Sequence, residues 1–156
     1  MSPFNLDNGI QKLLGSITVS SKPITVAKAG FLPSLDLAKH PNGYIYWDLS
    51  EQSPMHNSEG LSDPGKGETT SFDLDIACVA HENTQRKALC DAVLDILQPV
   101  VNNRRTQLTS YSVPGTGVFI NYVRFVSSAE AMEAKTAQSN PDVTVILLSF
   151  TGKATL

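Results

Sequence analysis

The sequence SFDLDIACV at residues 71–79 alternates apolar and polar side chains, and it is followed by TQRKALCDAVLDILQ at residues 84–98. Alternation places residues 72, 74, 76 and 78 on an apolar face and Asp73, Asp75 and Ala77 on a wet face, which predicts a half-buried strand. The second stretch carries its apolar residues at a 3.6-residue period and meets Pro99 at its end. It therefore predicts an amphipathic helix that covers the apolar face of the strand.

The segments before this pair predict less regular structure. Residues 6–17 have helical spacing, with Asp7 or Asn8 suited to the N-cap and Gly15 to the end of the helix. Residues 22–27 read as a weak strand and the aromatic run YIYW at 44–47 as a strong one. Alternation in this run places Tyr44 and Tyr46 on one face and Ile45 and Trp47 on the other. Both faces of the strand therefore need to be covered by other parts of the protein or by a neighbouring subunit. Residues 50–67 lack periodicity and predict a long flexible loop.

The segments after the main helix predict three more strands. Residues 106–113 and 117–126 are joined through a short glycine-containing turn, and residues 143–150 form an apolar strand. Residues 127–140, rich in Ala and Glu, read as an insertion with a helical turn around 129–134. We therefore expect an α+β fold: a mostly antiparallel sheet packed against one main helix (84–98) plus a short N-terminal helix, in a single domain over residues 1–156.

The composition excludes several classes of function. The 156 residues carry a net charge of −3, with 17% charged and 41% hydrophobic residues, unlike a chain that holds nucleic acid mainly by charge. No apolar run is long enough to span a membrane, and the N-terminus does not resemble a signal peptide. Cys78 and Cys90, the two cysteines, sit at apolar positions and read as small hydrophobes. We expect a soluble domain.

No residues of the sequence predict catalysis, a cofactor or a metal. GLSDPGKG at 60–67 resembles a phosphate-binding loop, but Gly67 stands where Ser or Thr would hold magnesium, and a strand follows rather than a helix. His81 lies next to Glu82 at a strand-to-helix junction, which favours a structural or solvated histidine. Asp73 and Asp75 are spaced for a carboxylate pair, although a charged solvent or interface face explains them better. We expect a protein that is not an enzyme.

The pair Arg104-Arg105 follows the main helix in a polar turn. One interpretation is a solvated turn that complements the negative end of the helix dipole. The other is contact with an anionic partner, with DNA passing through a lumen, or with a neighbour's Asp73 and Asp75.

The order of these segments resembles the tail terminator proteins of long-tailed bacteriophages. The shared layout is an amphipathic N-terminal helix (IQKLL, 10–14), an aromatic strand after a turn (PNGYIYW, 41–47), a polar loop, the strand 71–79, the helix 84–98 and a last apolar strand (DVTVILLSF, 142–150). The insertion at 127–140 departs from the compact pattern of the family.

The resemblance implies a structural protein of the virion tail or neck, assembled in the host cytoplasm. It implies a homo-oligomeric ring, with six copies expected, that caps the finished tail tube and joins it to the head connector. On this basis Asp73, Asp75, Arg104 and Arg105 are candidates for the ring interface or lumen. The candidate partner-binding loop consists of Ser62, Asp63, Pro64, Gly65 and Lys66. The alternatives are another head–tail joining protein, and a small ligand-binding domain or enzyme.

Overall fold

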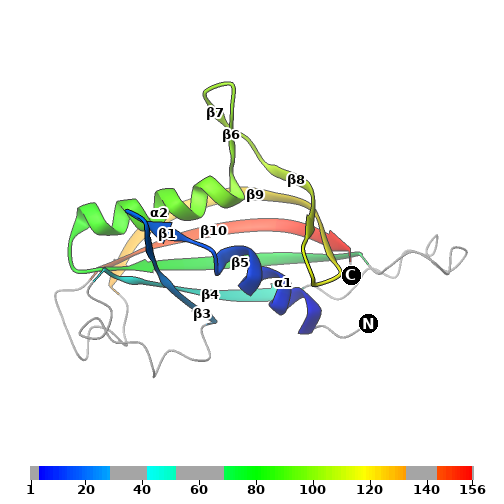
Figure 1. Cartoon of the computed structure of the whole chain (residues 1–156), viewed down its shortest axis with the longest axis horizontal. Coiled ribbons are helices and arrows are strands. Elements are labelled where there is room, and N and C mark those ends of the chain that lie inside the picture. The colour runs from blue at the N-terminus through cyan, green and yellow to red at the C-terminus, as the bar shows by residue number, and fades with distance from the viewer. Residues whose placement is uncertain (1–3, 29–41, 52–68, 133–143, 156) are drawn as a thin grey trace, which may run out of the picture.

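A computed structural model describes residues 4–28, 42–51, 69–132 and 144–155 of the chain. Two helices and ten strands follow one another in these segments (Figure 1). The elements are α1 (Phe4–Leu14), β1 (Thr18–Val19), β2 (Lys22–Pro23), β3 (Thr25–Lys28), β4 (Tyr44–Glu51), β5 (Thr69–Val79), α2 (Asn83–Leu97), β6 (Val100–Val101), β7 (Arg104–Arg105), β8 (Leu108–Val113), β9 (Val118–Met132) and β10 (Thr144–Thr155).

Six strands form one sheet in the order β3-β4-β5-β10-β9-β8. Only the pair of β3 and β4 is parallel, and every other pair in this sheet is antiparallel. The short hairpins β1-β2 and β6-β7 stand apart from it. The expected α+β fold with a mostly antiparallel sheet is therefore confirmed.

Both helices bury their apolar stripes against the same face of the sheet. Leu6, Ile10 and Leu14 of α1 share one core with Leu89 and Val93 of α2. The predicted alternation of β5 is confirmed for the side chains at 72, 74, 76 and 78, which belong to this core, and for those at 73 and 75, which are exposed. The expected wet face is wrong at Ala77, which is buried in a second cluster on the opposite face of the sheet. No helix in the described part of the chain is long and apolar enough to cross a membrane.

The aromatic strand also has the two faces that its alternation predicts. Ile45 and Trp47 enter the core beneath the helices. Tyr44 belongs to a smaller buried cluster on the opposite face, with Val79, Val145 and Ala77, and Tyr46 packs against it.

The helical turn predicted around residues 129–134 is wrong for the described part of that segment. Ser127 to Met132 extend β9, and their Cα partners run along β10 from Ser149 to Thr144. Ala and Glu favour a helix locally, but pairing along a neighbouring strand overrides this weak preference. The long β10, which continues to Thr155, supplies that pairing. Residues 133–140 of the expected insertion lie outside the described residues.

Other predicted boundaries also move, and the weak strand expected at 22–27 is divided into β2 and β3. β4 continues to Glu51 because Ser50 and Glu51 pair with β5, so the long loop does not begin at Ser50, and residues 52–67 lie outside the described residues. Helix α1 begins at Phe4, which places Asp7 in the first turn rather than at the N-cap. Helix α2 begins at Asn83 with Glu82 as its N-cap, one residue before the expected start.

The predicted polar turn at residues 102–105 is a hairpin. Val100 pairs with Arg105 and Val101 with Arg104, so the two arginines form β7 rather than the turn. Asn102 and Asn103 make the turn with positive φ angles of 54° and 63°. Asparagine tolerates this left-handed region better than most residues, which suits a two-residue hairpin turn.

Candidate functional site

Three surface features of the described chain can contact another molecule. They are a pocket between α1 and β3, the sheet face opposite the helices, and the hairpin β6-β7 beyond the end of α2. They differ in how far their polar groups are already satisfied within the chain.

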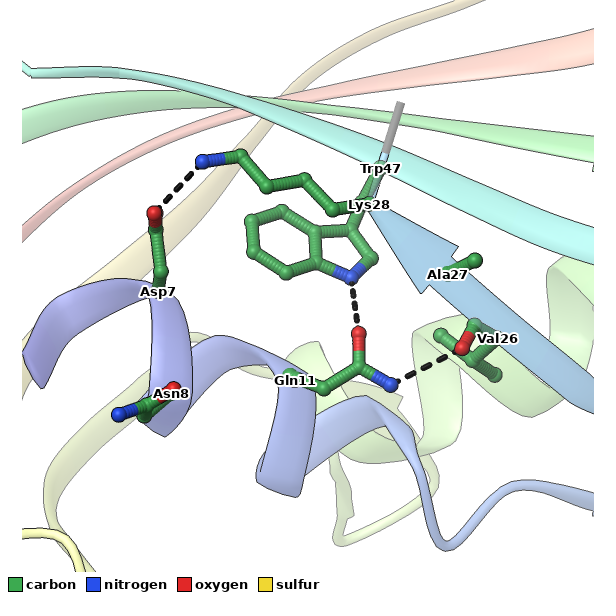
Figure 2. A pocket seen from close by; sticks show the side chains of 7 residues that line it. All are labelled: Asp7, Asn8, Gln11, Val26, Ala27, Lys28 and Trp47. Carbon is green, nitrogen blue, oxygen red and sulfur yellow. Dashed lines mark hydrogen bonds and ion pairs between the residues drawn. The ribbon is translucent and has the colours of Figure 1, made fainter. Parts of the chain in front are cut away.

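The pocket has a volume of about 540 Å³ and lies where α1 approaches the edge of the sheet (Figure 2). Gln11 bridges its two sides: its amide donates to the Val26 carbonyl oxygen at 2.9 Å, and its amide oxygen accepts from the Trp47 indole N–H at 2.7 Å. Across the opening, Lys28 Nζ pairs with an Asp7 carboxylate oxygen at 2.6 Å. The same ammonium group lies 5.7 Å from the centre of the Trp47 ring, within cation–π range.

The size of the pocket falls within the range of small-molecule sites. However, the indole, the amide of Gln11 and the Asp7–Lys28 ion pair already satisfy one another. A ligand would have to break these bonds and replace them. The arrangement fits a brace that holds α1 against the sheet edge better than a prepared binding site.

The opposite face of the sheet carries a group of aspartates that we call the acidic face: Asp48 on β4 and Asp73 and Asp75 on β5. All three are exposed. Asp48 is the direct cross-strand partner of Asp75, and Ser50 is the partner of Asp73. Ser149 on β10 donates a hydrogen bond to Asp75 at 2.8 Å.

This arrangement places two like charges opposite each other. Directly opposed residues of an antiparallel pair have Cβ atoms about 4.5–5.5 Å apart, and like charges there are destabilising. Among the described residues, the ion pairs are Asp7–Lys28 and Asp95–Arg105, so no cation in this part of the chain pairs with the acidic face. No group of His, Cys, Asp and Glu in the described chain could hold a metal ion.

The hairpin β6-β7 extends away from the body of the domain beyond the C-terminal end of α2 (Figure 1). We call it the arm, residues 100–105. Its base is fixed by Thr106, whose backbone N–H and hydroxyl both donate to the Pro99 carbonyl, at 2.8 Å and 2.9 Å. Val100 and Val101 are 56% and 53% exposed, so two adjacent apolar side chains of the arm face the solvent.

The two arginines predicted as a unit have different surroundings. Arg105 donates to Asp95 at 3.1 Å and to the Gln98 carbonyl oxygen at 3.2 Å, next to the C-terminus of α2. This bears out the interpretation of Arg105 as a complement to the helix C-terminus. Arg104 is exposed and has no hydrogen bond or ion pair to other described residues.

The structure therefore brings some of the predicted residues together and separates others. Asp73 and Asp75 share the acidic face, as their spacing predicts, whereas Arg104 and Arg105 lie on the arm and make no ion pair with them in the same chain. Ser62, Asp63, Pro64, Gly65 and Lys66 lie outside the described residues, so the binding loop stays a prediction. Asp48 was missed, although its position two residues after Tyr46 already places it on the face of Tyr44 and Tyr46.

The two cysteines are buried, as expected, and they also interact. The hydrogen bond that the Cys78 thiol donates to Cys90 raises the pKa of Cys78, and burial raises it further. The same hydrogen bond stabilises the thiolate of Cys90 and lowers the pKa of that residue. His81 is exposed at the junction of β5 and α2.

No known protein family profile matches the sequence, and no curated protein matches it either. Among solved structures, the fold is similar to a chain in the virion of a native gene transfer agent particle, with a TM-score of 0.50 and 16% sequence identity. The alignment covers 94% of this chain and 84% of that chain. At this identity the likeness establishes the fold alone, because one fold hosts many functions.

Proposed function

We propose that the protein is a non-enzymatic structural protein of a phage-like virion that caps the completed tail tube as a hexameric ring. The observation that carries the proposal is the similarity, over 94% of the chain, to the fold of a chain in a virion particle. The order of elements, which resembles the tail terminators, points to the same role. The ring would offer its second side to the head connector, and DNA would pass through its lumen only transiently.

The surfaces of the domain support an assembly of this kind. One face of the sheet is covered by two helices, whereas the aspartates of the acidic face are exposed and make no ion pair within the described chain. The arm is a third surface, different from both. A contact between two different surfaces of identical chains forms a ring when its rotation closes and a filament when it does not. A protein that ends tube growth needs such closure and two unlike sides.

Another head–tail joining protein is the nearest alternative, and it would bind the portal assembly instead of the tube. A small ligand-binding domain is the alternative from another class, and the pocket of about 540 Å³ is the observation that favours it. The internal pairing of Gln11, Trp47, Asp7 and Lys28 speaks against a ligand there.

The first test is the mass of the purified protein by light scattering after gel filtration, over a concentration series and with tail tubes from the particles that the encoding genome produces. We expect either a species of about six chains, or a monomer that forms rings at the tube ends. A strict monomer or dimer that ignores tubes contradicts the proposal. Binding to isolated connectors but not to tubes favours the other neck role.

A second test concerns the predicted binding loop. Deleting residues 63–66 is expected to leave ring formation intact and to prevent the joining of tails to heads, counted by electron microscopy of the particles. Normal infectious particles from this deletion would contradict a role of the loop in joining. A matched replacement of the same four residues by Gly and Ser controls for loop length.

A further inference from the structure

The two outermost strands of the sheet, β3 and β8, are poorly suited to pair with another chain. At one edge, β3 has only four residues, and α1 covers it through the Gln11 bond to the Val26 carbonyl and the Lys28–Asp7 ion pair. At the other edge, β8 is interrupted by Ser110, which has a φ angle of 51°. A short, covered edge and a kinked edge both resist the addition of a strand. These two strands therefore disfavour strand addition, while β9 continues from Arg124 to Met132 beyond the end of its pairing with β8.

Asp48 and Asp75 make no ion pair with a cation of the described chain. Arg124 on β9 and Lys153 on β10 lie on the same face but at its Asp73 end, because Thr151 is the partner of both Asp73 and Arg124, and Lys153 is the partner of Ser71. Asp48 and Asp75 oppose each other directly, and Asp73 lies two residues along the same face. The next row of residues on this face is apolar: Tyr46 on β4 and Leu147 on β10 are both cross-strand partners of Ala77 on β5, which lies between them. Tyr46 and Leu147 are only half-buried. A matching partner would therefore carry one cation beside one apolar side chain.

The arm presents this combination. Cross-strand partners share a face of a hairpin, so Val100 lies on the face of Arg105, and Val101 on the face of Arg104. The first face is turned toward α2, because Arg105 binds Asp95 and the Gln98 carbonyl. The second face therefore presents an exposed valine beside an arginine without a described partner. Residues 96–129, which include the arm, contain three arginines and no carboxylate.

We infer that the arm of one copy docks on the acidic face of the next, with Arg104 between Asp48 and Asp75 and Val101 against Tyr46 and Leu147. Charge complementarity carries the choice of a second copy as occupant. The contact joins two different surfaces, so it is of the kind that generates a closed ring or a filament. The inference rests on the proposed function for the ring, and it assigns the residues that hold the ring together.

Charge reversal tests the contact with two single variants. Arg104→Glu puts a carboxylate on the arm, and Asp75→Lys puts an ammonium on the face, so each variant alone brings like charges together. Each is expected to weaken self-association by about tenfold or more in analytical ultracentrifugation. Lys87→Glu, the same charge change at an exposed position on α2, is the matched control and should leave association unchanged.

Mixing the two variants provides the sharper result. In a 1:1 mixture that alternates around the ring, the arm of each Arg104→Glu chain meets the face of an Asp75→Lys chain, so opposite charges meet again. At the remaining contacts a native arm meets a native face. The mixture is therefore expected to recover the mass of the wild-type assembly, and so is the double variant. If Asp75→Lys does not fold by circular dichroism, Asp48→Lys replaces it, because Asp48 faces the same arginine.

The outcomes separate this inference from the proposed function. Single variants that assemble like wild type, or a mixture that fails to recover, overturn the contact while leaving the ring in place. Wild-type protein that stays monomeric to its solubility limit, with and without tail tubes, overturns the contact and the ring together. Labelling the protein in purified particles with a gold-conjugated antibody then shows independently whether it belongs to the virion.

Discussion

The amide of Gln11 is a residue-scale link between the N-terminal helix and the sheet. It donates to the Val26 carbonyl oxygen of the edge strand and accepts from the indole of Trp47, which is 1% exposed. One side chain therefore satisfies a strand carbonyl and a buried N–H. Nothing about a glutamine on a half-polar helix face predicts this, because the two partners come from other segments.

Gln11→Ala is expected to lower the free energy of unfolding by about 1–3 kcal/mol, because it leaves a buried N–H and a carbonyl without partners. Urea unfolding followed by tryptophan fluorescence measures the loss and also reports the environment of Trp47. Gln85→Ala, the same substitution at a half-buried position of α2, is the matched control and should change stability far less. Equal losses of unfolding free energy in both variants would show that the hydrogen bonds of Gln11 add nothing beyond the packing of its side chain.

The Cys78–Cys90 hydrogen bond gives a residue-scale prediction on pH. Because the bond lowers the pKa of Cys90, its thiolate should form at lower pH in the folded protein than in urea. The ultraviolet absorbance of the thiolate during a pH titration measures this. Cys78→Ala removes the donor, so the titration of Cys90 is expected to move to higher pH. An unchanged titration in Cys78→Ala would contradict the bond.

At the scale of elements, β10 organises the fold because it lies between β5 and β9 and pairs with both along its length. At Gly152 its backbone lies very close to both neighbouring strands. The cross-strand partners of this glycine are Phe72 on β5 and Val123 on β9. A Cβ atom at position 152 would lie 2.5 Å from the Tyr122 carbonyl oxygen and 2.6 Å from the Phe72 ring. Glycine is therefore required there by the space between the strands.

Gly152→Ala is expected to reduce stability by about 2–3 kcal/mol, since the backbone carbonyl of Tyr122 and the buried Phe72 ring must both shift. Thermal unfolding of the purified variant measures the effect. Gly117→Ala is the control: it meets no atom within 4 Å, and only its φ angle of 72° is strained, so about 1 kcal/mol is expected. A Gly152→Ala loss no larger than the control would mean that the sheet adjusts freely.

At the scale of the whole molecule, the acidic face links the stability of one chain to its assembly. The opposed Asp48 and Asp75 repel each other in the isolated domain, and an incoming Arg104 would relieve that repulsion. The same carboxylates should therefore weaken the monomer and strengthen the contact between copies.

Asp48→Asn is expected to stabilise the monomer by a few tenths of a kcal/mol at low ionic strength, and the gain should fade at high salt. The amide oxygen can still accept from the Leu49 N–H, which lies 3.0 Å from Asp48 in the wild type. Self-association, measured by sedimentation, should weaken in the same variant. Asp91→Asn, on the exposed side of α2, is the control and should change neither quantity. If Asp48→Asn lowered both the stability of the monomer and the self-association, the proposed repulsion between Asp48 and Asp75 would be contradicted.

The sequence alone determined which way the side chains of the central elements point. Periodicity is a local property, so the alternation at 71–79 identified the buried face of β5 and the exposed Asp73 and Asp75, and the 3.6-residue stripe identified the buried face of α2. The alternation of Tyr44 to Trp47 likewise predicted two buried faces of β4. From these faces the α+β class followed.

Only the tertiary structure decided which segments meet. The register of β4 on β5 opposes Asp48 to Asp75, and the length of β10 makes a strand of Ser127–Met132 against the local preference for helix. The fold also separates Arg105, held by Asp95, from Arg104, which faces outward from the arm. These outcomes depend on pairings between residues far apart in the chain, and the periodicity within a single segment carries no information about register.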